Sequence, residues 1–359
     1  MRVAIVGCGQ IADAHIQEVR KIEGSTVVAV CDLDEHMAEQ AAARFGIAAR
    51  YTSLDRMLDD TRPDVVHVTT PPASHLPIGR VLIEHGIHAY VEKPFTVTAA
   101  EAEELVGEAR KRGVMLCAGH NVAFDSAFLR LRQAVDQGVL GEIVHLDALM
   151  GYNLTGPFGA VLMADPVHWV HRLPGGLAQN NLSHPLSLLL PFLGDPRPVV
   201  VARGFRWRKE RFGDRRDRFF DELRASLTGD EVTASLVFSC RARPVQQHLT
   251  VHGTRAQAVV SLDARTVRFV RGASLPGPFA RAQWACRDFG EARREAWRQV
   301  VNLARARLHF FEGMQELFRR FYAAVEGRAA MPIPMEEAVR AARVMDDVVA
   351  ACGEDAAPP

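Results

Sequence analysis

The sequence predicts an α/β protein in two parts: an N-terminal doubly wound parallel sheet, and a C-terminal α+β domain with a mostly antiparallel sheet. Three observations predict it. Strand-like and helix-like periodicities alternate over the first 120 residues, as in a parallel sheet with helical crossovers. Between residues 198 and 271, strand-like segments follow one another with no helix between them. At 359 residues the chain is also long for a single domain.

The first part is expected to contain five strands and the helices that connect them. The strands are short and apolar, and lie at 2–6, 26–31, 64–69, 87–91 and 114–118. The helices are expected at 12–22, 35–45, 75–85 and 98–113. Gly46, Gly86 and Gly113 fit helix C-terminal ends, and Thr98 with Glu101 forms a capping box at the start of the last helix.

From residue 121 the pattern changes to that of an α+β domain. A helix at 126–137, a strand at 142–150 and a helix at 177–193 surround a segment rich in glycine, proline and aromatic residues, which we expect to be loop. Six strands are expected at 198–205, 219–228, 231–240, 246–252, 257–262 and 266–271. Helices at 290–327 and 335–351 precede a tail that we expect to be frayed. The expected domains are therefore 1–120 and 121–359.

Composition narrows the class of function. The chain has 43 basic and 43 acidic residues, so its net charge does not favour nucleic acid or an anionic membrane as a partner. An arginine-rich run at 203–218 is interleaved with acidic residues and is expected to be solvated. The six cysteines form no CxxC pair, and no apolar run reaches the roughly 18 residues of a membrane span. We expect no signal peptide, because the first strand begins at residue 2, and predict a reduced, cytoplasmic protein.

The clearest local motif is GCGQIA at 7–12, between the first expected strand and the first expected helix. Gly7 allows a tight turn. Gly9 has no Cβ, so a pyrophosphate can approach the helix N-terminus, where free N–H groups and the helix dipole favour anions. Ala12 stands where a third glycine is common and is small enough for close helix–strand packing. We favour a dinucleotide-binding loop over a plain strand–turn–helix connection.

Asp32 ends the second expected strand, twenty residues after Ala12. A carboxylate at this position can accept hydrogen bonds from ribose hydroxyls and would repel a 2′-phosphate, which favours NAD over NADP. His36, the nearby base that could offset this repulsion, lies outside the strand end.

Two more motifs follow strands of the same domain: TTPPASH at 69–75 and EKP at 92–94. Ligands of open parallel sheets bind outside the carboxyl ends of the strands. The side chains expected to face one such crevice are Asp32, Pro71, His75, Glu92 and Lys93. The alternative for Glu92 and Lys93 is a solvated charge pair at a turn.

These motifs resemble those of the Gfo/Idh/MocA oxidoreductases, a family named after glucose–fructose oxidoreductase, inositol dehydrogenase and a protein of rhizopine catabolism. The resemblance covers most of the chain. Its matching pieces are GCGQIA at 7–12, the strand end at Asp32, TPPASH at 70–75, EKP at 92–94, AGHNVAFD at 118–125, VHGTRAQAVVSLD at 251–263 and the terminal helix region at 321–346.

The resemblance implies a Rossmann domain joined to a domain with a large open-faced sheet, whose outer face packs in homodimers or homotetramers. It implies NAD(P)-dependent oxidation or reduction of sugars, cyclitols and their derivatives. In the family pattern Lys93 lies near the reacting carbon, and Glu92 contacts the nicotinamide ribose. Cofactor contacts are therefore expected from Gly7, Gly9, Gln10, Ile11, Asp32, Thr70, Pro71, His75, Glu92 and Lys93.

Oxidation of an alcohol also needs a group that takes the hydroxyl proton, and a histidine suits that role. The family places such a histidine on a helix, four residues after an aspartate, in a stretch like PGGLAQNNLSH at 174–184. Here His184 matches the histidine, but Asn180 stands at the aspartate position. Asn180 can orient substrate hydroxyls from the same helix face, yet its lack of charge should leave His184 less basic.

Lys93 should then carry more of the proton handling. An ammonium beside a cationic nicotinamide is disfavoured, so we expect the pKa of Lys93 to fall. Pro185 predicts a kink or a new helix start near Ser183. The alternative for His184 is an ordinary buried helix histidine without a catalytic part.

The stretch DPVHWVHRLPGG at 165–176 offers further polar and aromatic side chains. His168 and His171 lack a third well-spaced ligand, so we expect no metal. Trp169 could pack on the C–H face of a sugar, or could be an ordinary packing residue. The candidate substrate-binding residues are Asn180, Asn121, His120, Trp169, His168 and Arg172.

We therefore predict an NAD-preferring oxidoreductase that acts on a sugar-like substrate, with Lys93 and His184 as catalytic residues. One alternative is a redox-neutral sugar hydrolase or isomerase that oxidises its substrate transiently and returns the hydride to tightly held NAD. The other alternative is a non-catalytic NAD-binding regulatory protein. It is retained because Asn180 stands at the position of the family's aspartate.

Overall fold

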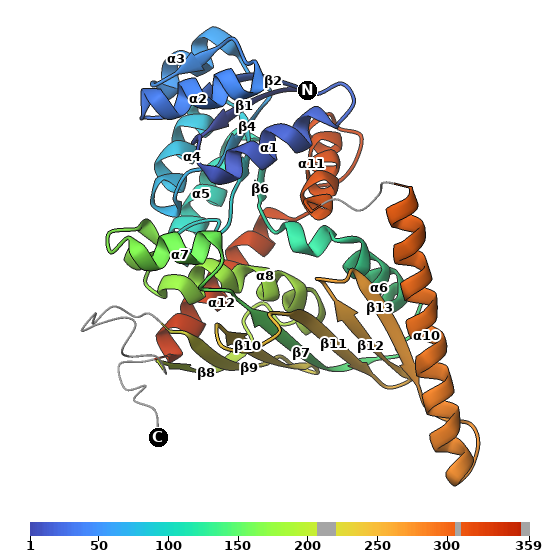
Figure 1. Ribbon diagram of the computed structural model, residues 1–359. Helices are drawn as coiled ribbons and strands as arrows, with labels where there is room; N and C mark the ends of the chain where they lie inside the picture. The colour runs from blue at the N-terminus through green and yellow to red at the C-terminus, as the bar shows by residue number, and fades with distance from the viewer. Residues whose placement is uncertain (207–219, 306–309, 353–359) are drawn as a thin grey trace. The chain divides into compact units, whose positions relative to one another are not determined.

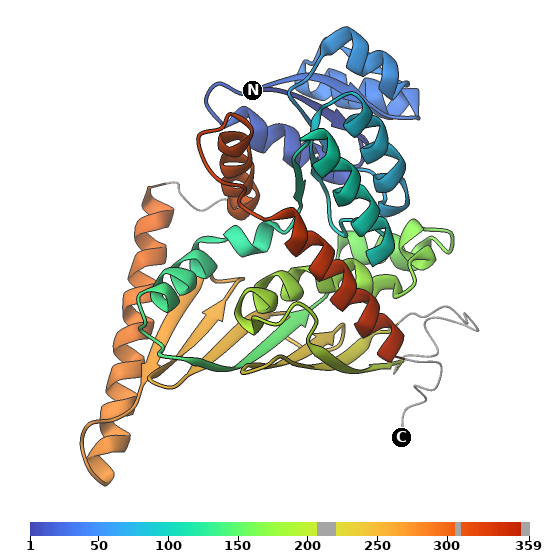
Figure 2. The same cartoon turned by 180° about the vertical axis from the view of Figure 1, so that it is seen from behind.

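The computed structural model describes residues 1–206, 220–305 and 310–352. The chain forms two compact units, whose elements are labelled in Figure 1 and seen from behind in Figure 2. The first unit contains residues 1–121 and 313–346, and the second contains residues 122–312 and 347–359. The break near residue 121 lies where the sequence pattern changes.

The first unit is built on a six-stranded parallel sheet in the order β3-β2-β1-β4-β5-β6. This order runs outward in both directions from the first strand, as predicted for a doubly wound sheet. The strands are β1 (Arg2–Val6), β2 (Thr26–Cys31), β3 (Arg50–Tyr51), β4 (Val65–Val68), β5 (His88–Val91) and β6 (Leu116–Ala118). The sequence did not predict β3, because two residues carry no readable periodicity.

The helices between these strands follow the predicted pattern, with two additions. They are α1 (Gln10–Arg20), α2 (Glu35–Phe45), α3 (Leu54–Thr61), η1 (Pro72–Ser74), α4 (His75–Glu84) and α5 (Ala99–Arg112). Gly46 and Gly113 end α2 and α5 in the left-handed conformation, with φ of 60° and 68°. The Thr98 side chain accepts a hydrogen bond from the Glu101 N–H, as the capping box predicts. The short helix α3 and the single turn η1 were not predicted.

Two helices at the end of the chain, α11 (Glu312–Val325) and α12 (Met335–Ala351), lie for the most part in the first unit. The sequence assigned them to the second domain, and 290–327 to one helix. Here α10 (Pro278–Ala304) and α11 are separate helices. Residues 313–346 return to the first unit because Phe318 and Tyr322, both at most 2% exposed, pack against His67 of its central sheet.

The second unit is built on a seven-stranded sheet in the order β13-β12-β11-β7-β10-β9-β8. All neighbouring strands are antiparallel except β7 and β10, which are parallel, so the predicted mostly antiparallel sheet is confirmed. The strands are β7 (Ile143–Gly151), β8 (Val199–Phe205), β9 (Glu222–Thr228), β10 (Thr233–Ser239), β11 (Gln247–Gly253), β12 (Ala256–Ser261) and β13 (Thr266–Arg271).

The described helices of this unit are η2 (Asn121–Phe124), α6 (Ser126–Asp136), α7 (Pro157–Ala164), η3 (Trp169–Arg172), α8 (Gly176–Leu193) and α10. The segment at 151–176 is therefore not all loop, because Pro157 starts a helix at its first position. Of the kink or new helix start predicted near Ser183, the new start was wrong, because α8 continues through Pro185. Its contacts with β7, β10 and η3 hold the helix across the missing backbone bond.

Two predictions concern segments outside the described residues. These are the arginine-rich run from residue 207 onward and the tail at 353–359. Within the part of the chain that is described, no helix has the length and hydropathy needed to cross a bilayer.

Candidate cofactor and active site

The glycine loop after β1 is fixed to the loop after β4. Gly7 has φ +94°, and a Cβ on it would lie 2.6 Å from Thr70 Cγ2 and 2.8 Å from the Thr70 nitrogen. The Thr69 hydroxyl donates to the Gly7 carbonyl at 2.6 Å. Glycine is therefore required at position 7 both by the backbone conformation and by the close approach of the neighbouring loop.

Gly9 is the N-cap of α1, and no described side chain caps this helix. A Cβ at Gly9 would meet no described atom within 4 Å, so open space lies before the helix N-terminus. Ala12 is fully buried, which confirms its packing role in the loop motif. Exposed backbone N–H groups, a helix dipole and room for a bulky anion together fit the pyrophosphate of a dinucleotide.

Asp32 at the end of β2 orients this loop. Its Oδ2 accepts from the Cys8 N–H at 2.6 Å, and its Oδ1 accepts from the Asp34 N–H at 3.0 Å. The remaining lone pairs of the carboxylate can accept from ribose hydroxyls. Burial, with the charge of Asp32, raises the pKa of the Cys8 thiol to about 12, so Cys8 is a neutral thiol inside the loop at physiological pH.

His75 was expected to contact the cofactor, but in the structure its side chain is fully buried. Its Nε2 lies 2.9 Å from the Thr70 carbonyl, and its Nδ1 lies 3.1 and 3.2 Å from the carbonyls of Pro94 and Phe95. Burial lowers the pKa of His75, and the hydrogen bonds to these carbonyls oppose the shift. The His75 ring joins the loop after β4 to the EKP loop after β5, and Thr70 and the exposed Pro71 are left to face a ligand.

The carboxylate of Glu92 points into the protein. Its Oε1 lies 3.0 Å from His15 Nε2, and its Oε2 accepts from the Lys93 backbone N–H at 3.0 Å. Burial opposes ionisation, but the hydrogen bond from His15 and the charge of Lys93 outweigh it, so the pKa of Glu92 is lowered. Both oxygens thus have protein partners, whereas the family pattern has this glutamate contacting ribose.

Lys93 is half-buried at the carboxyl end of β5. Burial lowers the pKa of its ammonium, and the negative charge of Glu92 opposes this shift. The pKa of Lys93 is shifted in the expected direction, but the cause is burial in the protein rather than the charge of a nicotinamide. A lysine whose amine is more readily neutral can act as a general base.

His120 and Asn121 follow β6, the last strand of this sheet. His120 is 6% exposed, and burial lowers its pKa to about 4, so it is neutral at physiological pH. Asn121 Oδ1 is buried and has no hydrogen-bond partner among the described residues. An unsatisfied buried carbonyl of this kind can accept a hydrogen bond from a hydroxyl of a ligand.

In the second unit, Asn180 and His184 lie one turn apart on α8, so they share a helix face. Asn180 is 3% exposed, and His184 is partly exposed. The hydroxyl of Ser187, two residues after Pro185, donates a hydrogen bond to the His184 carbonyl at 2.7 Å. The pairing of these two side chains on one face is as the sequence predicts.

The helical turn η3 packs against α8 and carries the other predicted substrate residues. His168 accepts from the Val170 N–H, and its ring lies 5.4 Å from that of the half-exposed Trp169. His171 Nε2 donates to the Leu162 carbonyl, and Arg172 to the Val167 carbonyl. Among the described residues no cluster of three or more metal-ligating side chains occurs.

Sequence reasoning missed three buried polar residues near Glu92: His15, His67 and Tyr322. His67 was visible as the one polar residue in the apolar strand segment VVHV, and His15 lies one helical turn after Ala12. Tyr322 carried no such signal, because it lies 230 residues after Glu92 in the chain.

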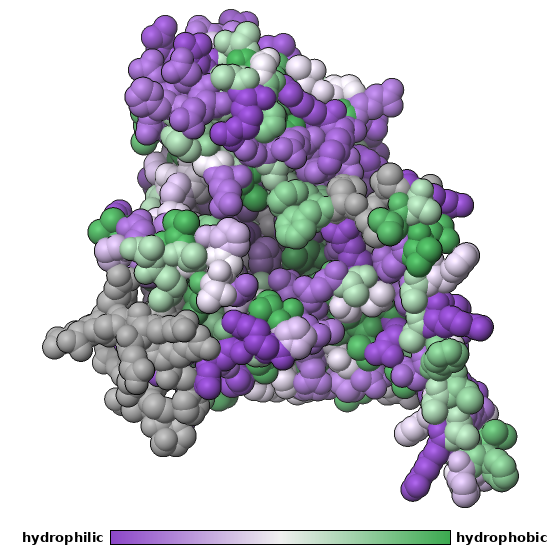
Figure 3. All heavy atoms as spheres, viewed as in Figure 1, coloured by the Kyte–Doolittle hydropathy of each residue, from purple (hydrophilic) through white to green (hydrophobic). Residues whose placement is uncertain are grey.

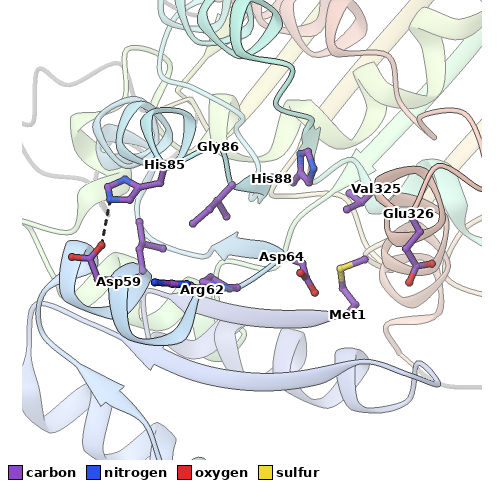
Figure 4. Close-up of a pocket in the computed structure, with 12 residues that line it drawn as sticks. Met1, Asp59, Arg62, Asp64, His85, Gly86, His88, Val325 and Glu326 are labelled. Atoms are coloured by element: carbon purple, nitrogen blue, oxygen red, sulfur yellow. Dashed lines mark ion pairs between the residues drawn. The ribbon is translucent and has the colours of Figure 1, made fainter.

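A hollow of about 890 Å³ lies elsewhere in the first unit (Figure 4). Met1, Asp64 and His88 place it at the amino ends of β1, β4 and β5, opposite the glycine loop. His85 and Asp59 form an ion pair at its rim, 4.0 Å apart. Ligands of doubly wound sheets bind at the carboxyl ends of the strands, so this hollow at the amino ends is not the candidate cofactor site.

Comparison with known proteins decides the family. A model described as the oxidoreductase family with an NAD-binding Rossmann fold matches residues 1–120, and the GFO/IDH/MocA C-terminal domain matches residues 128–259. The chain belongs to the Gfo/Idh/MocA oxidoreductase family. The resemblance seen in the sequence is thereby confirmed.

Curated relatives of this family member include myo-inositol 2-dehydrogenase of Thermotoga maritima, which is 23% identical over 57% of this chain and 58% of its own. D-glucoside 3-dehydrogenase of Escherichia coli is 36% identical over 40% of this chain and 41% of its own. The matched stretches thus span about two fifths to three fifths of these relatives.

Solved structures share the whole fold. The WlbA dehydrogenase from Bordetella pertussis, in complex with NADH and UDP-GlcNAcA, has a TM-score of 0.78 at 18% identity, over 98% of this chain and 95% of its own. UDP-N-acetylglucosamine 3-dehydrogenase GnnA from Acidithiobacillus ferrooxidans has a TM-score of 0.73 at 20% identity, over 98% of this chain and 97% of its own.

Proposed function

We propose that this family member is an NAD-dependent oxidoreductase that transfers a hydride between nicotinamide and a hydroxyl or carbonyl carbon of a sugar, cyclitol or related polyhydroxylated substrate. The observation that carries the proposal is Lys93, a half-buried base beside an ionised Glu92, in the same unit as a glycine loop that fits a pyrophosphate. The dehydrogenase names of the relatives support the substrate class.

When bound, the nicotinamide supplies the carbon that accepts or donates the hydride. The chain's own residues then handle the proton and the substrate. In the oxidative direction Lys93 takes the hydroxyl proton, with His184 as a second base, and Asn180 orients a neighbouring hydroxyl. Further substrate contacts are assigned to His120, Asn121, His168, Trp169 and Arg172.

We assign NAD rather than NADP to the glycine loop. The carboxylate of Asp32 already orients the loop through Cys8, so it is held where an adenosine ribose is expected, and its charge opposes a 2′-phosphate. Gln10, Ile11, Thr70 and Pro71 complete the proposed cofactor contacts.

The test compares NADH with NADPH in fluorescence titrations, followed by turnover of a panel of sugars and cyclitols. We expect NADH to bind at least about tenfold more tightly, which corresponds to about 1.4 kcal/mol. In Asp32→Asn, which keeps an acceptor for the Cys8 N–H but removes the charge, the two affinities should converge. Equal affinities in the unaltered protein would contradict the NAD assignment.

The same panel separates the alternatives. A protein purified with stoichiometric NAD that converts a substrate without net cofactor reduction would be the redox-neutral enzyme. NAD binding without turnover of any substrate would favour a regulatory protein.

We also propose self-association as a homodimer or homotetramer through the sheet of the second unit. Val199 and Val201 of β8 are each 68% exposed, which supports burial of this face in an assembly. The six cysteines are free thiols, which supports a cytoplasmic location.

A further inference from the structure

Four polar side chains in the interior of the first unit form one hydrogen-bonded chain. Tyr322 Oη lies 2.8 Å from His67 Nε2, and His67 Nδ1 lies 2.9 Å from His15 Nδ1. His15 Nε2 in turn lies 3.0 Å from Glu92 Oε1. None of the four is more than 6% exposed, although they come from α11, β4, α1 and the end of β5.

Aromatic rings enclose this chain. The ring of Phe318 lies 4.5 Å from that of His67 and 5.1 Å from that of His15, and Tyr90 stacks on His67 at 5.0 Å. In such an apolar surrounding an unsatisfied donor or acceptor is costly, so the direction of each hydrogen bond is strongly constrained.

One direction satisfies every group. An ionised Glu92 accepts from His15 Nε2–H, which leaves Nδ1 of a neutral His15 as an acceptor. His67 must then donate from Nδ1, and its Nε2 accepts from the Tyr322 hydroxyl. A protonated His15 would reverse the two later bonds and leave the Tyr322 proton without an acceptor among the described residues. Burial lowers the pKa of His67, in agreement with a neutral ring.

We propose that Tyr322, His67 and His15 are positioning residues, which hold Glu92 in place and in its charged form and thereby set the protonation of Lys93. This inference depends on the proposed function in one respect, namely that Lys93 is a catalytic residue. The other titratable groups that face Glu92 are Tyr90, His75 and His120. Among the side chains that the structure describes, none of these three donates a hydrogen bond to its carboxylate, so His15 is the side chain that supports the charge.

The consequence for Lys93 follows from electrostatics. Without a donor from His15, burial favours the protonated carboxyl of Glu92. Loss of that negative charge removes the interaction that raises the pKa of Lys93, while the burial that lowers it remains. The amine of Lys93 should therefore become neutral at a lower pH.

The experiment measures the pKa of Lys93 by NMR of ¹³Cε-labelled lysine, which needs no turnover. The sequence has only four lysines, Lys21, Lys93, Lys111 and Lys209, so assignment through Lys93→Met is direct. We expect His15→Leu to lower the pKa of Lys93 by about one unit. His15→Gln, whose amide can still donate to Glu92, should keep the wild-type value.

An unchanged pKa of Lys93 in His15→Leu, or an equal shift in both variants, would overturn the proposal. A failed dehydrogenase assay would not, because this titration is independent of substrate. ¹⁵N-histidine spectra of the unaltered protein provide the second measurement: we expect an Nδ1–H tautomer for His67 and an Nε2–H tautomer for His15. Tyr322→Phe should perturb the His67 tautomer, and the reverse tautomers would contradict the assigned direction.

A second, independent observation concerns α10 in the second unit, a helix of 27 residues. One side is attached to β13: Glu295 is buried, bonded to Arg130 and to the Val267 N–H, and Arg268 pairs with Asp288. Figure 1 shows the helix running past the edge of the sheet, and Figure 3 shows apolar residues along it. Its large apolar side chains that are more than half exposed are Phe279, Trp284, Phe289, Trp297, Val300 and Leu303.

Part of this exposed surface repeats with the spacing of a coiled coil. Steps of three and four residues connect Phe279, Ala282, Cys286, Phe289, Arg293, Ala296, Val300 and Leu303, all of which are exposed. We call these eight residues the α10 seam. Seven of them are apolar or weakly polar, and the seam lies away from the buried Glu295.

The seam is complementary to itself when two copies run antiparallel. With the crossing centred at residue 291, Phe279 faces Leu303, Ala282 faces Val300, and Cys286 faces Ala296. Arg293 of each copy then faces Phe289 of the other, where a guanidinium can stack on the ring. In a parallel pair Arg293 would face Arg293, which brings two like charges together.

We propose that the α10 seam binds the α10 seam of a second copy of this chain in an antiparallel helix pair. The arginine in the middle of the seam favours this partner over a lipid surface, where the charge would lie at the centre of the buried face. This contact is separate from the proposed contact through the sheet, and both can exist in one assembly.

Cysteine cross-linking tests the pairing, because Cys286 is exposed and the other five cysteines are buried. Under mild oxidation Ala296→Cys should form a covalent dimer, since position 296 faces Cys286 of the second copy. The unaltered protein should not, because its two Cys286 residues are about 15 Å apart in this arrangement. Adding Cys286→Ser to Ala296→Cys should abolish the dimer.

A dimer that forms equally well in the unaltered protein would mean a parallel pair, and no dimer in Ala296→Cys would mean no pairing through the seam. Binding to phosphatidylserine vesicles without cross-linking would identify a membrane surface instead. Each of these results overturns the proposal.

Discussion

Replacing Lys93 by methionine is expected to lower kcat by about 10²–10⁴-fold while NADH affinity changes little. Methionine keeps an unbranched side chain of similar length, so packing around the half-buried site is preserved. The amine that takes the hydroxyl proton is lost, and the effect should therefore fall on turnover. Lys111→Met, which changes an exposed lysine of α5, is the matched control and should keep full activity.

The protonation of Lys93 should also make the activity depend on pH. Burial disfavours the charged form of Lys93, so its pKa lies below the ordinary lysine value of 10.5. For alcohol oxidation the neutral amine is the base, so kcat/KM should rise with pH up to the pKa of Lys93, and Lys93→Met should lose this rise. If Lys93→Met retains both the turnover and the rise, Lys93 is not the base, and His184 must be tested in its place.

Substitutions in the glycine loop are expected to separate backbone strain from cofactor contact. Gly7→Ala places a Cβ within 3 Å of Thr70 at a φ of +94°, so we expect a loss of about 1–3 kcal/mol in the free energy of unfolding. Gly9→Ala meets no described atom, so the unliganded protein should keep its stability within about 0.5 kcal/mol. Its affinity for NADH should nevertheless fall at least about tenfold, because the methyl group occupies the space for the pyrophosphate.

Thermal unfolding without ligand and NADH titration together check this pair of variants. Unchanged NADH affinity in Gly9→Ala would remove the helix N-terminus from the cofactor site. Unchanged stability in Gly7→Ala would mean that the loop after β4 can move away from residue 7.

The periodicity of the sequence was sufficient to predict the central elements of both units. Alternation with period two is a property of each strand by itself, and glycine caps such as Gly46 and Gly113 mark helix ends locally. α3 was missed although it carries a helix pattern of its own, with Ser53 as N-cap and Met57, Leu58 and Thr61 buried on one face. β3 was missed because its two residues are held by a neighbour in the sheet rather than by a pattern of their own. Pro185 misled for the related reason that tertiary packing holds α8 across it.

Part of the candidate site could likewise be predicted from the sequence, and part could not. The residue types and spacing of the glycine loop, Asp32 and the EKP motif were enough to indicate an NAD-binding domain, and the family match confirmed it. Where the side chains point was not readable: His75 turns inward between three carbonyls, and Glu92 turns towards His15.

By itself the sequence determined the fold class, the family and the glycine loop after β1, because these depend on local patterns that a short stretch of chain carries. Only the tertiary structure decided which residues support Lys93. Glu92, His15, His67 and Tyr322 become neighbours through burial in a common interior, and α11 brings Tyr322 back over a separation of 230 residues. A hydrogen-bonded chain across four elements depends on how those elements pack, and no local pattern encodes that packing.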